Sequence, residues 1–261
     1  MFTLPIAAAL GTAVLSTAFI SGMFGMAGGM ILMGILLAML PVATAMVLHG
    51  VTQMASNGWR AWMWRARIDW PVVAYYAVGA AAATFAFAAV GLVPGKSIAL
   101  IMLALISFGG LIVPGRFAPD VRRGSHALGC GALCTVLQLV AGVSGPILDV
   151  FFVRSDLGRK DMVATKAAIQ VVGHALKVAY FGQLLASGHE LPVAVVALAI
   201  VLALAGTQAS RRVLEAISDA QFRRWTRSLI AVIAAACLIH GLALLSDDLP
   251  AIAPVLAAVR P

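Results

Sequence analysis

The sequence has few charged residues, because Asp, Glu, Lys and Arg together make up only 11% of its 261 residues. Hydrophobic residues make up 62%. This balance excludes an ordinary soluble globular protein. Several apolar runs approach the ~20 residues that a helix needs to cross a bilayer. The composition therefore predicts an all-α polytopic membrane protein.

Cysteine is also scarce. Cys130 and Cys134 lie four positions apart in an apolar segment, and Cys237 stands alone in another. This spacing fits neither a disulfide framework nor a metal-binding cluster. We expect the three cysteines to be small core or lipid-facing residues, with no metal site and no cofactor.

Acidic residues are few relative to basic ones, with 10 against 18, which gives a formal net charge of +8. The basic residues form no stripe that would suggest a nucleic-acid partner. Most of them lie in four short loops. Because such loops face the cytoplasm, both termini are predicted outside. The loops hold Arg60, Arg65 and Arg67; Arg116, Arg122 and Arg123; Arg154, Arg159 and Lys160; and Arg211, Arg212, Arg223, Arg224 and Arg227.

The chain contains an internal repeat. Residues 42–71 align without a gap on residues 163–192, and at a slightly smaller separation Gly22 and Gly25 align on Gly142 and Gly145. Equivalent loops carry opposite charge patterns, which indicates two copies with inverted topology. We divide the chain into a first transmembrane repeat, 1–120, and a second, inverted one, 121–261. Inverted repeats are typical of secondary transporters.

Ten apolar segments follow one another along the chain. Two of them, 30–40 and 146–153, are too short to cross ~30 Å of hydrocarbon. We expect two broken or re-entrant half-helices and about eight full spans; whether 4–21 and 126–142 span fully stays open. A glycine-rich break precedes each half-helix, and broken backbone at this depth must line a cavity or be buried in protein. The alternative is that the glycines only permit close helix packing.

The breaks suit an anion, because the first N–H groups of a helix are unpaired and its dipole is positive there. The polar residues of the following segments repeat at i, i+4 and i+7, which places them on one helix face. Polar groups in hydrocarbon usually face a cavity, although they can also join helices. The predicted substrate-binding residues are Gly25, Gly28, Gly29, His49, Gln53, Ser56, Asn57, Ser144, Gly145, Gln170, His174 and Lys177.

Asp149 is the only carboxylate inside an apolar segment. Together with His174 it is a candidate for proton coupling. It can also form an ion pair with Lys177, or stabilise the start of the second half-helix through the helix dipole.

The stretch from Phe19 to Gly29, followed by the stretch from His49 to Arg60, resembles the TauE/SafE sulfite exporter family. The match of repeats and length extends over essentially the whole chain. This resemblance implies a multi-pass transporter of the bacterial inner membrane that exports sulfite, sulfoacetate or a related organosulfur anion. It also implies an ion gradient as the driving force, with H+ as the expected coupling ion. Homo-oligomerisation is possible.

Two other functions compete with a transporter that works by alternating access. One is a passive anion channel. The other is a rhomboid-like intramembrane serine protease, because Gly142, Ser144 and Gly145 match a G-x-S-G motif and His174 is available as the base. The duplicated architecture and the lysine one turn from His174 argue against the protease, so we expect no enzymatic activity.

Overall fold

The computed structural model describes residues 3–24, 26–113, 118–185, 191–216 and 219–258, and within these ranges it shows helices and no strands. The apolar segments form helices close to their expected bounds, together with a short 3-10 turn, η1. The elements are α1 (Leu4–Phe24), α2 (Ala27–Met39), α3 (Val42–Met63), η1 (Arg65–Arg67), α4 (Trp70–Val90), α5 (Lys96–Ile112), α6 (Gly124–Ala141), α7 (Gly145–Phe152), α8 (Arg159–Leu185), α9 (Val193–Ala216) and α10 (Asp219–Ala258).

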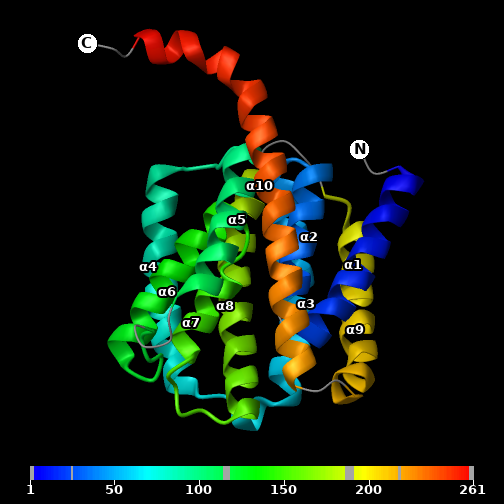
Figure 1. The fold of residues 1–261 in the computed structure, drawn as a ribbon, viewed down its shortest axis with the longest axis vertical. Helices are drawn as coiled ribbons and strands as arrows, with labels where there is room; N and C mark the ends of the chain where they lie inside the picture. The colour runs from blue at the N-terminus through cyan, green and yellow to red at the C-terminus, as the bar shows by residue number, and fades with distance from the viewer. Residues whose placement is uncertain (1–2, 25, 114–117, 186–190, 217–218, 259–261) are drawn as a thin grey trace.

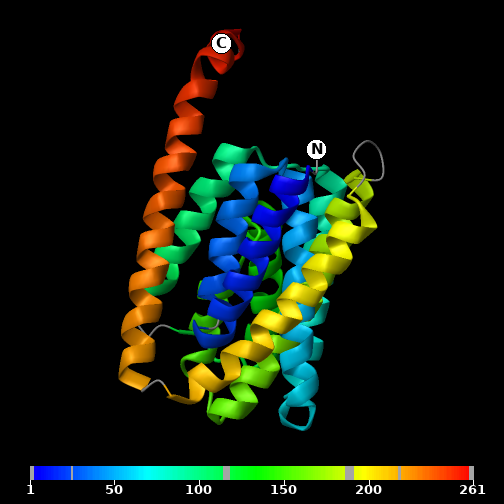
Figure 2. The same ribbon diagram turned by 90° about the vertical axis from the view of Figure 1, so that its right-hand side faces the viewer.

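The helices form one bundle, with α3 packed directly against α8 (Figure 1). Two further pairs make extensive contacts, α1 with α9 and α4 with α6. α5 packs against α10, which runs along one edge of the bundle and continues beyond the other helices (Figures 1 and 2). The polar faces of α3 and α8 are therefore turned toward each other inside an otherwise apolar bundle.

Five helices are long and apolar enough to cross a membrane by length and composition. They contain the spans Leu4–Met23, Trp70–Val90, Gly124–Ala141, Val193–Ser210 and Arg224–Ser246. α3 and α8 have 22 and 27 residues, which is long enough at 1.5 Å per residue, but their polar residues lower their hydropathy. α5 has 17 residues. The count of eight full spans stays a prediction.

The two expected half-helices are present. α2 has 13 residues and α7 has eight, so they are about 20 Å and 12 Å long, well short of the hydrocarbon thickness. Gly142, just before α7, has a φ of +79°, a conformation that glycine adopts without strain. Pro146 follows at the start of α7, where a missing N–H costs no helical hydrogen bond.

α4 and α6 approach each other at two glycines. A Cβ atom on Gly79 would lie 2.0 Å from the Leu128 carbonyl oxygen, and one on Gly131 would lie 2.0 Å from the Tyr76 carbonyl oxygen. The α1–α9 pair has a similar contact, because a Cβ atom on Gly206 would lie 2.5 Å from the Leu15 carbonyl oxygen. In both pairs the helices touch backbone to backbone.

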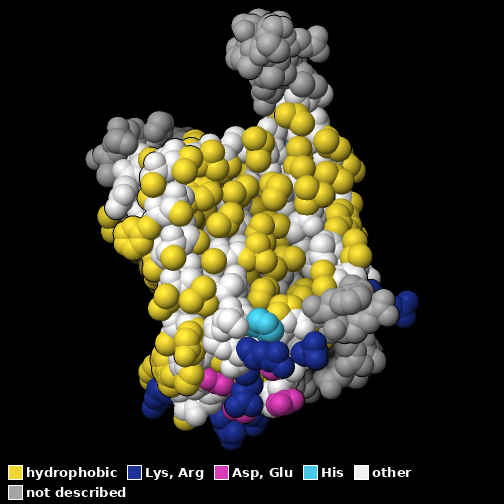
Figure 3. Space-filling view, turned by 90° about the vertical axis from the view of Figure 1, so that its left-hand side faces the viewer, with side chains coloured by type: hydrophobic (Ala, Val, Ile, Leu, Met, Phe, Trp, Pro, Cys, Tyr) yellow, Lys and Arg dark blue, Asp and Glu magenta, His cyan; other side chains and the backbone are white. Residues whose placement is uncertain are grey.

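Lys and Arg side chains gather at one end of the bundle, below a broad apolar surface (Figure 3). The loops before α4 and before α8 reach this end, whereas α1 begins and α10 ends at the opposite end (Figure 1). Large apolar side chains such as Phe85, Val90 and Val232 are mostly exposed along the helices. An apolar belt above a charged end is the surface expected of a protein embedded in lipid.

The three cysteines are buried free thiols, and the Sγ atoms of Cys130 and Cys134 lie 3.8 Å apart. The described residues contain no group of three or more His, Cys, Asp or Glu side chains that could hold a metal ion.

Candidate functional site

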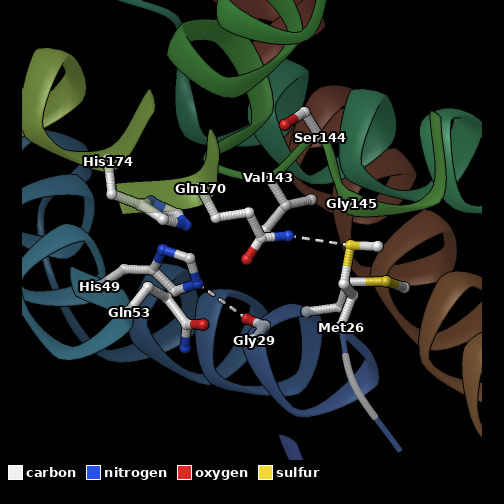
Figure 4. Close-up of a pocket in the computed structure, with 10 residues that line it drawn as sticks. Met26, Gly29, His49, Gln53, Val143, Ser144, Gly145, Gln170 and His174 are labelled. Atoms are coloured by element: carbon white, nitrogen blue, oxygen red, sulfur yellow. Dashed lines mark hydrogen bonds between the residues drawn. The ribbon is translucent and has the colours of Figure 1, made fainter. Parts of the chain in front are cut away.

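A pocket lies where the starts of α2 and α7 meet the polar faces of α3 and α8 (Figure 4). The pocket is small in this conformation, with about 20 Å³ open to the centre of a water-sized sphere, which is room for about one water molecule. Its lining residues are Met26, Gly29, Met30, His49, Gln53, Val143, Ser144, Gly145, Gln170 and His174.

The two half-helices converge on this pocket through Met26 and Gly145. A Cβ atom on Gly145 would lie 2.2 Å from the Met26 sulfur, so a side chain at position 145 would force Met26 to move. Gln170 Nε2 donates to the same sulfur atom over 2.9 Å. Met26 therefore connects the start of α2 to both α7 and α8.

His49 is held in one tautomer by two partners. Its Nε2 atom lies 2.9 Å from the Gly29 carbonyl oxygen, and because a carbonyl only accepts, Nε2 carries the hydrogen. Nδ1 lies 2.8 Å from Lys177 Nζ and accepts from it, as a neutral imidazole can. Lys177 also donates to the Gly142 carbonyl oxygen over 2.9 Å. A neutral imidazole thus separates the ammonium group from the pocket.

His174 faces His49, with 5.4 Å between the ring centroids and the ring planes inclined at 61°. Its Nδ1 atom lies 2.7 Å from Gln138 Nε2. An amide nitrogen only donates, so Nδ1 accepts and the hydrogen of the neutral ring is on Nε2. Ser144 Oγ donates to the other end of the same amide, Gln138 Oε1, over 3.3 Å. Gln138 thus joins the second break to His174.

The sequence analysis did not include Gln138 among the site residues. The signal was present, because Gln138 is the only amide side chain in the apolar segment 126–142 and is 2% exposed. It was missed because it lies on α6, outside the repeated trio of α8. Met26, Met30 and Val143 were also missed as lining residues, since apolar side chains carry no such signal.

The structure brings together seven of the twelve predicted residues, and the others lie elsewhere. Gly28 packs against α1, since a Cβ atom there would lie 2.2 Å from the Thr17 carbonyl oxygen, as the packing alternative predicts. Gly25 lies outside the described residues. Ser56, Asn57 and Lys177 are buried but do not line the pocket. The lining residues among those predicted are Gly29, His49, Gln53, Ser144, Gly145, Gln170 and His174.

A family model for the sulfite exporter TauE/SafE matches residues 9–237 of the chain. The chain belongs to the TauE/SafE family. The matched range begins within α1, covers α2 to α9 and more than half of α10's apolar span, and so includes the whole pocket. No curated protein and no solved structure matches the chain. Members of this family are transporters rather than enzymes, and the apolar helices fit a multi-pass membrane protein.

One expectation was an ion pair between Asp149 and Lys177. This pair is not formed in this TauE/SafE protein. Asp149 contacts Lys166 instead, and its side chain is 49% exposed. Asp149 lies one turn after Gly145 on α7 and is not among the residues that line the pocket. The expected ion pair with Lys177 was wrong: Lys177 is fully buried and bonded to His49 and Gly142, whereas Asp149 is half-exposed beside Lys166.

The geometry of Ser144 also bears on the protease alternative. A serine nucleophile needs its base within hydrogen-bond reach. Here Ser144 Oγ donates to Gln138, and it is Gln138 that contacts His174. The amide therefore separates the serine from the histidine in this TauE/SafE protein, and the Ser-His pair that the protease alternative requires is not formed.

Proposed function

We propose that this protein is a secondary transporter that exports sulfite or a small organosulfur anion by alternating access around the described pocket. The observation that carries the proposal is the contact of the Lys177 ammonium with His49, directly behind the pocket wall at the meeting point of two half-helices. The family supports a small sulfur-containing anion as the substrate class.

The pocket offers hydrogen-bond donors without a carboxylate among its lining residues. His174 presents Nε2–H, and Gln53 and Gln170 bring amide groups. At the start of α7, Pro146 has no N–H and Ile147 N–H donates to the Ser144 carbonyl oxygen, which leaves the Gly145 N–H as the donor of this turn. Donors in a water-poor site bind an anion strongly because they need little reorganisation. The macrodipoles of α2 and α7 add positive potential at the same point.

The packing of the helices supports two halves related by a pseudo-twofold axis, as alternating access requires. If α1–α5 are exchanged for α6–α10 in order, the α1–α9 contact becomes the α6–α4 contact, and both occur. The α3–α9 and α4–α8 contacts form a second such pair. The α3–α8 and α5–α10 contacts map onto themselves. The domain division at residue 120 and the inverted topology belong to this proposal.

We propose that the basic end of the bundle faces the cytoplasm of a bacterium, with both termini outside. A proton gradient is the proposed driving force. His174 is the first candidate for binding the coupling proton, because it lines the pocket and is not bonded to Lys177, whereas both ring nitrogens of His49 are engaged by Gly29 and Lys177. Asp149, half-exposed beside Lys166, is the second candidate. A sulfite ion that arrives with a proton would need less compensating positive charge.

Flux into proteoliposomes tests the proposal. Sulfite, sulfoacetate, thiosulfate and an equal-sized carboxylate are offered with and without an imposed pH gradient. Saturable sulfite flux that the pH gradient accelerates supports a coupled transporter. Flux that does not saturate and ignores the gradient would instead establish the passive channel. A carboxylate moved faster than every sulfur anion would contradict the substrate class.

A further inference from the structure

The polar face of α3 continues beyond the pocket toward the basic end of the bundle. Asn57 follows Gln53 by one turn, and Arg60 follows Asn57 by another. Positions three and four apart on a helix are neighbours on one face. Gln53 lines the pocket, so Arg60 lies about 10 Å further along the same face at 1.5 Å per residue.

Both residues carry buried donors without a hydrogen-bond partner. Asn57 is 2% exposed, and its Nδ2 atom makes no hydrogen bond. The Nε atom of Arg60 is also buried without a hydrogen bond. Polar atoms that are buried in a protein are almost always paired, so two such donors one turn apart require an explanation. An acceptor that comes and goes would supply it.

Arg60 also has no neutralising partner in the described part of the chain. The ion pairs found there join Arg67 to Asp161, Arg122 to Asp69 and Lys166 to Asp149. The contact made by Arg60 is a hydrogen bond from Nη2 to Ser21 Oγ over 3.3 Å, which links α3 to α1. Since a hydroxyl does not cancel charge, the guanidinium stays electropositive. A planar guanidinium is well suited to hold two oxygens of an oxyanion.

We propose that Asn57 and Arg60 form a second oxyanion site, on the route between the midplane pocket and the basic end of the bundle. This inference rests on the proposed transport function and gives it a direction. The anion reaches Arg60 first from the basic end and then moves along α3 to the donors around Gln53. Two sites of moderate affinity let an ion both enter and leave, whereas one tight site would retain it.

The equivalent positions on α8, which lie within the described residues, do not repeat this pair. At the positions 121 residues after Asn57 and Arg60, α8 carries Val178 and Phe181, and Phe181 is fully buried in the apolar core. The repeat therefore presents a cation and an amide toward one end and two apolar side chains toward the other. A transporter built this way collects its anion more readily from the basic end, which matches export if that end is cytoplasmic.

Half-saturation concentrations measured from each end separately test this site. Inside-out vesicles present the proposed cytoplasmic face to added sulfite, and right-side-out vesicles present the opposite face. Arg60→Gln should raise the half-saturation concentration about tenfold from the basic end and change it less than about twofold from the other, given the usual strength of a charge-assisted hydrogen bond. Arg60→Lys should recover part of the loss.

Arg65→Gln is the matched control, because Arg65 is an exposed arginine just after α3 that donates to the Trp62 carbonyl oxygen. It should behave like the wild type. If Arg60→Gln does not insert, Asn57→Ala carries the test, with an expected rise of about threefold from the basic end. Equal effects of Arg60→Gln and Arg65→Gln, or wild-type values for Arg60→Gln and Asn57→Ala, would overturn the second site.

The same oxyanion chemistry is offered by the phosphate of a lipid headgroup. Liposomes of zwitterionic lipid with and without phosphatidylglycerol separate the two sources. An Arg60→Gln effect that is independent of phosphatidylglycerol supports the transported solute as the ligand, and one that needs this lipid overturns it. If the wild type moves no anion at all, the proposed function itself fails. If the wild type transports sulfite but the Arg60 and Asn57 variants have the same half-saturation concentrations as the Arg65→Gln control, only the second site fails.

Discussion

The Nζ atom of Lys177 lies 2.8 Å from Nδ1 of His49, although the two residues are 128 positions apart in the sequence. The contact joins α8 to α3 across the centre of the bundle. Lys177 is fully buried and makes its second hydrogen bond to the Gly142 carbonyl oxygen. One ammonium group therefore ties both polar helices to the second break, and its charge acts on the pocket through a neutral imidazole.

Replacement of Lys177 should affect transport more than folding. Lys177→Met keeps the length of the side chain and removes the charge behind the pocket. We expect sulfite flux to fall at least about tenfold, because the anion loses its nearest formal positive charge. Proteoliposome flux measures this, normalised to the amount of protein inserted. Lys160→Met, a change of an exposed lysine over the Trp64 ring, is the control, and equal flux in the two variants would remove Lys177 from the mechanism.

The pairing of Lys177 with His49 also has a consequence for stability. His49→Phe removes the acceptor and leaves the buried ammonium with one partner, which typically costs about 1–3 kcal/mol. The double variant His49→Phe/Lys177→Met removes both polar groups and should be more stable than His49→Phe alone. Thermal unfolding in detergent measures the difference. Additive effects of the two changes would show that the pair is not coupled.

Gln138 should act as a positioning residue. Gln138→Leu removes the donor that keeps His174 in one tautomer and the acceptor that holds Ser144. We expect transport to fall at least about tenfold with the half-saturation concentration changed as well, because two buried hydrogen bonds are lost and each typically contributes about 1 kcal/mol. Thr135→Val, one turn earlier on the same helix and not a pocket residue, should leave the transport parameters at wild-type values. A Gln138→Leu variant with unchanged flux would contradict this role.

The contact between Gly145 and Met26 predicts a rescue. Gly145→Ala places a methyl group where the Met26 sulfur now lies, so the Met26 side chain must move. We expect impaired transport, typically with about 1–3 kcal/mol of destabilisation from overpacking. The double variant Gly145→Ala/Met26→Ala shortens the side chain at position 26 and should restore part of the transport activity and part of the stability.

Gly129→Ala provides the reference for this pair, because a Cβ atom there would have no heavy atom within 4 Å and alanine favours a helix. It should be neutral or slightly stabilising. A double variant that is no better than Gly145→Ala alone would mean that Met26 does not limit position 145.

The sequence predicted the helices well because their signals are local. The ten apolar runs, the two short segments and the glycine breaks all appear at close to the expected positions. The sequence placed His49 and His174 in one predicted site, because each lies on the polar face of its repeat, but it did not predict that the two rings face each other. The breaks were harder to interpret, since a glycine that lines a pocket and a glycine that packs against a helix look the same in the sequence. Gly29 proved to be the first kind and Gly28 the second.

The partners of the polar residues could not be predicted, because they depend on which helices become neighbours. Lys177 was expected beside the anion, but the packing of α3 against α8 places it behind His49. Asp149 and Lys166 contact each other across two helices, α7 and α8, a relationship that spacing along one helix does not contain. Gln138 belongs to a third helix, α6, whose register against α8 is set by packing.

The glycine contacts between Gly79, Gly131 and the backbone of the facing helix restrict how this molecule can change shape. Helices in contact through their main chains have no flexible side chains between them to absorb sliding, so α4 and α6 must travel as a single rigid strut. The Gly206 contact makes α1 and α9 a second strut. A movement of the helices that opens the pocket to one side of the membrane must then occur where the α4–α6 pair and the α1–α9 pair contact α3 and α8. Spin labels placed across α4 and α6 would keep a constant separation through the cycle.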